Sequence, residues 1–103
     1  MKKLIRDKIP EIIEKKWWKC NYYIADEVEY NIELLKKIVE EAIEVQNSNN
    51  KNELIEELAD VMEVINSISK NNWITKKEIE AYRLDKLKLK WWFDKKYIYE
   101  FKK

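Results

Sequence analysis

The sequence predicts an all-α fold, a bundle of about four helices in a single domain that spans residues 1–103. Two observations support this prediction. Three segments open with a helix-capping residue, Asp26, Asn50 or Thr75, and each has a glutamate three residues later. The apolar residues that follow recur at the three- and four-residue spacing of an amphipathic helix.

The first predicted helix is the shortest, and Pro10 is tolerated there because it falls in the first turn. The second and third helices are separated only by the polar break "NSNNKN", so we expect them to pack antiparallel. The predicted helices cover residues 7–16, 26–46, 50–70 and 75–90.

Two short runs outside the helices are rich in tyrosine and isoleucine, "CNYYIA" (20–25) and "KYIYEF" (96–101). Their rough alternation of apolar and polar residues is typical of strands. They are therefore candidates for a minor two-stranded antiparallel ribbon.

Composition excludes several classes of protein. Charged residues make up 40% of the chain but nearly cancel to a net charge of +1, which argues against binding to a nucleic-acid polymer. No apolar run approaches the ~20 residues that span a bilayer, and the early charges do not suit a signal peptide. A single cysteine, Cys20, suits a reducing cytoplasm, so we expect a cytoplasmic protein without a membrane partner.

The chain has no histidine, so any chemistry must use carboxylates, lysines and bound cations. Each of the second and third helices carries an acid pair at positions i and i+3, on the flank of its apolar stripe. When the helices pack antiparallel, the two pairs face one cleft and repel unless a cation neutralises them. An all-oxygen site favours Mg²⁺ or Mn²⁺ over zinc. The predicted ligands are Glu41, Glu44, Glu57 and Asp60.

A structural interpretation of these acids is also open. A glutamate at the edge of an apolar arc can pair with lysine or reach solvent, and this chain is rich in lysine. That interpretation is sufficient for one acid pair. Two pairs at the same helical phase on adjacent helices favour the metal site.

The acids also form a motif. "EEAIE" (40–44), followed after twelve residues by "ELAD" (57–60), resembles the E-E-x-x-E … E-x-x-D motif of the MazG-like all-α NTP pyrophosphohydrolases. "KLIRDKIPEII" (3–13) is similar to the opening of one branch, the phosphoribosyl-ATP pyrophosphohydrolase-like house-cleaning proteins. The resemblance implies Mg²⁺-dependent hydrolysis of a nucleoside triphosphate to its monophosphate and pyrophosphate.

Carried over by position, the resemblance implies metal ligation by the four acids named above. The first motif glutamate matches Glu40, which a helical projection turns ~200° from Ile38 and away from the other acids, so its catalytic role stays open. The basic residues that match the ends of the branch are candidates for binding substrate phosphates. They are Arg6, Lys8, Lys86 and Lys90.

Two other functions stay open. One is a phosphoribosyl-ATP pyrophosphohydrolase of histidine synthesis, which the "RDKIP" stretch disfavours weakly. The other is a catalytically silent helical oligomerisation module, which retention of all four motif acids disfavours. In each case we expect a homodimer or larger homo-oligomer, because a chain this short has little core to bury.

Tryptophan is unusual in number and position. The chain has five tryptophans and no glycine, where roughly 7% glycine is usual. Each lies just after a predicted helix end, where a left-handed glycine is expected. They either pack at an interface or on a nucleobase, or stand where a UGA codon reassigned to glycine has been read as tryptophan. The residues are Trp17, Trp18, Trp73, Trp91 and Trp92.

Overall fold

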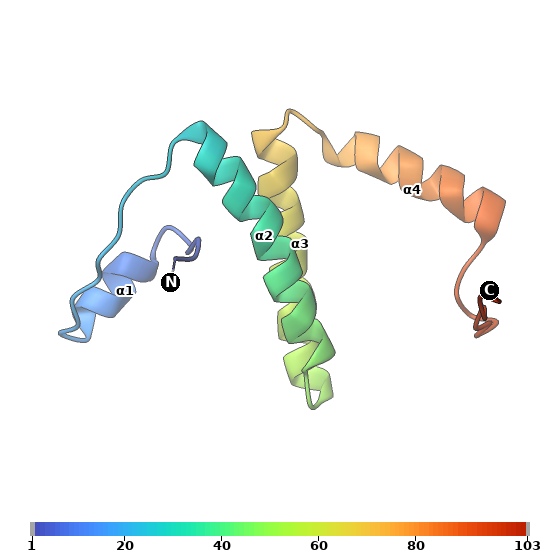
Figure 1. Ribbon diagram of the computed structural model, residues 1–103, viewed down its shortest axis with the longest axis horizontal. Helices are drawn as coiled ribbons and strands as arrows, with labels where there is room; N and C mark the ends of the chain where they lie inside the picture. The colour runs from blue at the N-terminus through green and yellow to red at the C-terminus, as the bar shows by residue number, and fades with distance from the viewer. Residues whose placement is uncertain (1, 103) are drawn as a thin grey trace.

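A computed structural model describes residues 2–102 of the chain. It contains four helices and, within those residues, no strand. The predicted all-α class is therefore confirmed, and the observed helix bounds lie within two residues of the predicted ones. The helices are α1 (Ile9–Lys15), α2 (Glu27–Gln46), α3 (Lys51–Asn71) and α4 (Lys76–Lys90) (Figure 1).

The three predicted capping residues begin their helices as expected. The side chains of Asp26, Asn50 and Thr75 accept hydrogen bonds from the backbone N–H three residues later, at 2.8, 2.9 and 3.1 Å. Thr75 and Glu78 form a reciprocal capping box, because the Glu78 carboxylate also accepts a hydrogen bond from the Thr75 backbone N–H at 3.2 Å. At the other two caps the glutamate carboxylate accepts a hydrogen bond from another nearby residue instead. These bonds satisfy N–H groups that a helix start leaves free.

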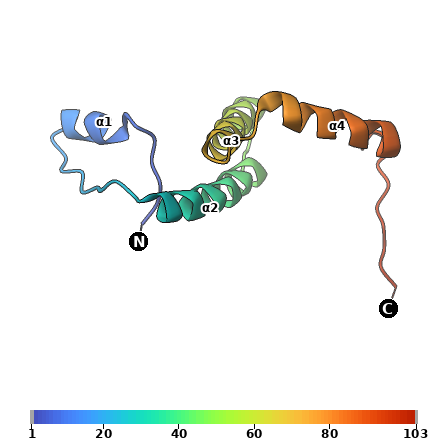
Figure 2. The ribbon, with the colours of Figure 1, turned by 90° about the horizontal axis from the view of Figure 1, so that it is seen from above.

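The centre of the fold is the antiparallel pair of α2 and α3, which lie side by side (Figures 1 and 2). Leu34 of α2 and Val64 of α3 are the buried hydrophobic side chains, at 2% and 8% exposure. Near one end of the pair, the side-chain amides of Asn71 and Asn72 donate to Asn31 Oδ1 at 3.3 and 3.1 Å. These bonds join the end of α3 to the start of α2.

The other two helices leave this pair on opposite sides (Figures 1 and 2). Neither α1 nor α4 contains a buried residue. The radius of gyration is 17.8 Å, whereas a compact chain of this length has about 13 Å. The single chain is therefore an open arrangement around one helix pair. Among residues 2–102, no helix is both long and apolar enough to cross a bilayer.

The predicted two-stranded ribbon is wrong. Residues 20–25 and 96–101 are not strands, and they lie on opposite sides of the α2–α3 pair (Figure 1). An isolated pair of strands is marginally stable in water even when its strands are adjacent. Here the central helices separate the two segments, so neither segment has the other beside it to form strand hydrogen bonds, although each alternates apolar and polar residues.

Three of the five tryptophans adopt the left-handed backbone expected at those helix ends. The φ angles are 65° at Trp17, 58° at Trp73 and 68° at Trp91. With ψ at −157°, Trp91 lies in a region that is essentially restricted to glycine. The first two side chains are 99% and 93% exposed, so packing offsets little of the strain. The backbone at these positions therefore suits glycine better than tryptophan.

We predict that Trp73→Gly stabilises the chain, because glycine adopts positive φ without the steric penalty of a Cβ. The expected gain in the free energy of unfolding is about 1 kcal/mol, measured by urea denaturation. Trp18→Gly is the matched control, since Trp18 is not among the positive-φ residues. Equal effects of the two substitutions would contradict the prediction.

Candidate metal centre

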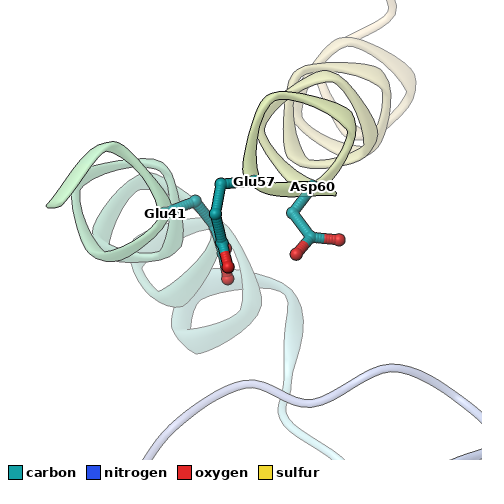
Figure 3. A group of neighbouring side chains, drawn as sticks. All are labelled: Glu41, Glu57 and Asp60. Atoms are coloured by element: carbon teal, nitrogen blue, oxygen red, sulfur yellow. The ribbon is translucent and has the colours of Figure 1, made fainter. Parts of the chain in front are cut away.

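The packing of α2 against α3 brings three carboxylates together. Glu41 lies on α2, and Glu57 and Asp60 lie three residues apart on one flank of α3. Figure 3 shows the three side chains pointing toward the same side of the helix pair. One carboxylate oxygen from each residue lies within 4.8 Å of the other two. We call these three residues the acid group.

The electrostatics of the acid group appear in the titration of Glu57. Burial raises the pKa of the Glu57 carboxyl above its usual value of 4.5, and the negative charges of Asp60, Glu44 and Glu41 raise this pKa further. All three members of the acid group are half-buried. Like charges held close together in this way favour either a proton or a bound cation.

The fourth predicted ligand, Glu44, is exposed and lies outside the acid group. Its charge nevertheless raises the pKa of Glu57, so the four acids share one electrostatic environment. Glu44 is one turn further along α2 than Glu41, at the edge of the arrangement. Its ligation of the same ion remains a prediction.

Two cations of the chain already contact the acid group. Arg6 Nη2 lies 3.0 Å from Asp60 Oδ1, and Lys37 Nζ lies 3.7 Å from Glu41 Oε1. Arg6 was a predicted phosphate-binding residue, whereas Lys37 was not predicted. The signal for Lys37 was its position four residues before Glu41, a spacing at which helical side chains meet.

Glu40 lies outside the acid group but shares a lysine contact with Glu41. Lys37 Nζ contacts Glu40 Oε1 at 3.1 Å as well as Glu41, and Lys3 Nζ lies 3.9 Å from the same Glu40 oxygen. The lysine therefore links the two adjacent glutamates. A long flexible lysine at this position contacts both carboxylates although their helix phases differ.

A cavity of about 510 Å³ lies beside the acid group, between the segment that precedes α1 and the α2–α3 pair. This volume lies within the usual range of ligand pockets. The polar part of its lining includes Arg6, Lys37, Glu41 and Asp60, and the apolar part includes Ile5, Ile9, Leu34 and Val64. The cavity thus has charged groups of both signs and an apolar wall.

The other predicted phosphate-binding residues lie elsewhere in the single chain. Lys8 is exposed at the start of α1. Lys86 and Lys90 are exposed on α4, which leaves the α2–α3 pair on the side opposite α1 (Figure 2). The fold of one chain does not bring these three lysines to the acid group, and their contact with substrate remains a prediction.

Comparison with known proteins adds no relative. No protein-family model, curated protein or solved structure matches this chain. The resemblance to the MazG-like pyrophosphohydrolases therefore depends on the acid motif and the N-terminal stretch quoted above.

We predict that Glu57→Gln stabilises the metal-free protein at about pH 7, and that the gain shrinks as the pH falls toward the usual carboxyl pKa of 4.5. A raised pKa in the folded state means that the folded chain binds more protons than the unfolded chain as the pH falls toward the usual value. Wild-type stability therefore rises over that window, whereas the glutamine does not titrate. Thermal unfolding in a chelator measures the difference.

Glu80→Gln is the control, because the hydrogen bond from Arg83 lowers the pKa of Glu80. This substitution should destabilise the chain at about pH 7, with the loss shrinking only as the pH falls through and below the usual value. A gap between wild type and Glu57→Gln that is independent of pH would contradict the assignment.

Proposed function

We propose that this protein is a Mg²⁺- or Mn²⁺-dependent nucleoside triphosphate pyrophosphohydrolase that removes non-canonical nucleotides in the cytoplasm. The reaction converts a nucleoside triphosphate and water to the monophosphate and pyrophosphate. The observation that carries the proposal is the convergence of Glu41, Glu57 and Asp60 within 4.8 Å at the edge of a cavity that also contains Arg6 and Lys37.

The donor chemistry fits a hard divalent cation. All three groups offer carboxylate oxygens, and the chain has no histidine that would favour a softer metal. Glu41, Glu57 and Asp60 would hold the ion, with Glu44 as a further ligand. When bound, such an ion supplies positive charge to phosphate oxygens and acidifies bound water.

The cavity supports the choice of substrate. A triphosphate needs cationic side chains, and Arg6 is the better of the two nearby, since a guanidinium can form two parallel hydrogen bonds to one phosphate. Lys37 would contribute a second positive charge. The apolar wall formed by residues such as Ile5 and Leu34 suits a nucleoside.

A silent oligomerisation module remains the second candidate function. Its support is the large exposed apolar surface of α2 and α3. Association into a homodimer or larger homo-oligomer is part of both proposals, so assembly does not distinguish them. Pyrophosphate release does distinguish them, and phosphoribosyl-ATP belongs in the substrate panel as the third candidate.

We expect pyrophosphate release from at least one member of a panel of canonical, deoxy- and damaged nucleoside triphosphates with Mg²⁺ or Mn²⁺. Glu41→Gln and Asp60→Asn should each abolish both Mn²⁺ binding and turnover while the helical circular dichroism is retained. Glu11→Gln, an exposed carboxylate on α1, is the matched control. Orthophosphate as the sole product would exclude this reaction class, and full activity in Glu41→Gln would exclude the site.

Arg6→Gln should have opposite effects on the two ligands. The Arg6 guanidinium forms an ion pair with the Asp60 carboxylate, which a metal ion would have to displace. Removing the guanidinium should therefore tighten Mn²⁺ binding. The gain should be up to about fivefold, because an exposed ion pair contributes up to about 1 kcal/mol. Nucleotide binding in the presence of metal should weaken. Titration calorimetry measures both, and Lys15→Gln controls for the change in net charge. A parallel change in both affinities would contradict this dual role.

A further inference from the structure

The end of α3 has the hydrogen bonds of a helix that terminates at glycine. The Ile74 N–H donates to the Ser69 carbonyl at 2.9 Å. The Trp73 N–H donates to the Lys70 carbonyl at 3.5 Å. Bonds at these two spacings define the Schellman motif, in which the left-handed residue is usually glycine. Here that residue is Trp73, with φ at 58°.

The ends of α1 and α4 are closed in related ways. After α1, the Trp17 N–H donates to the Glu14 carbonyl at 3.1 Å, and φ at Trp17 is 65°. After α4, the Trp91 N–H donates to the Leu87 carbonyl at 2.8 Å, and its φ and ψ of 68° and −157° suit only glycine well. Among residues 2–102, the only other positive φ belongs to Lys96. Left-handed backbone therefore coincides with tryptophan at all three helix ends.

The indole side chains do not explain the tryptophans. All five are exposed, from 65% at Trp92 to 99% at Trp17, although tryptophan is on average a highly buried residue. The Lys95 Nζ lies 5.4 Å from the centroid of the Trp91 ring. Such a cation–π contact contributes little at an exposed site. The strain of positive φ at these positions is thus not offset by packing.

The tryptophans also do not form one aromatic surface. They follow the ends of α1, α3 and α4, and these three helix ends are well separated (Figures 1 and 2). Trp91 and Trp92 line a cavity of about 370 Å³ after α4. A binding role for that cavity would account for two of the five residues and for none at the other helix ends. A shared interface or stacking platform therefore does not account for the pattern.

Glycine at the five positions would give the chain an ordinary composition. The chain has no glycine, and five glycines among 103 residues would be about 5%, close to the usual ~7%. The exchange is also complete, since tryptophan stands at each glycine-like helix end and no glycine remains elsewhere. A single codon that is read in two ways exchanges every copy of one residue for the other, whereas separate mutations do not.

We infer that positions 17, 18, 73, 91 and 92 are glycine in the protein that its own cells make, because those cells read the codon UGA as glycine. Reading the same codon as tryptophan gives the five tryptophans. Glycine caps α1, α3 and α4 without strain and removes five exposed indoles. The cavity after α4 then loses two of its walls. The inference is independent of the metal and the reaction.

Mass spectrometry of the protein isolated from the cells that encode it tests the inference directly. Trypsin cleaves after lysine and so releases residues 71–76 and 91–95 as separate peptides. Fragment masses should identify glycine at positions 73, 91 and 92, and the gene should have UGA at all five positions. Tryptophan in these peptides, or the ordinary tryptophan codon UGG in the gene, would overturn the inference.

Two recombinant variants test the backbone argument separately. One carries Trp17→Gly, Trp73→Gly and Trp91→Gly, and the other carries alanine at the same three positions. Both lose the indoles, but alanine keeps the Cβ that disfavours positive φ. In urea denaturation the glycine variant should unfold at a higher midpoint than the alanine variant and the tryptophan chain. Equal midpoints for glycine and alanine would overturn the structural basis of the inference, and neither result would bear on pyrophosphate release.

Discussion

The antiparallel contact of α2 with α3 is the constraint on which the rest of the structure depends. Because the helices run in opposite directions and their buried residues are Leu34 on α2 and Val64 on α3, positions of equal phase relative to these residues emerge on the same side of the pair. This geometry gathers the carboxylates on one side and the uncharged aliphatic residues on the other. A rotation of either helix by a quarter turn would mix the two surfaces and eliminate both.

The acidic side is electrostatically unfavourable without a counter-ion. Carboxylates from two helices are half-buried there, and burial together with their mutual repulsion raises the pKa of Glu57. The chain offsets part of this repulsion with its own cations, Arg6 from the segment before α1 and Lys37 from within α2. The contact between Arg6 and Asp60 also ties that segment to α3. The position of the chain start is thus coupled to the charge state of the acid group.

The features that sequence predicted correctly are those that local interactions determine. Asp26, Asn50 and Thr75 cap helices because each bonds to an N–H three residues away, and such bonds need no distant partner. The meeting of Glu41 with Glu57 followed from helical phase and one short break. Pairing of residues 20–25 with 96–101 was predicted wrongly because it depended on where α1 and α4 lead the chain. The contact that Glu40 and Glu41 share with Lys37 depended on the reach of the lysine side chain, which a helical projection does not represent.

The positive φ angle at Trp73 has a consequence for the path of the chain. An L-residue at this joint is easier to accommodate in the right-handed region, whereas glycine or a D-residue accepts the observed turn without strain. Relaxation of residues 72–75 into the right-handed region would fuse α3 and α4 into one rod of about 60 Å, at 1.5 Å per residue. The backbone conformation at Trp73 therefore decides whether α4 turns away from α3 or continues it as one helix. It also decides which direction Lys86 and Lys90 face.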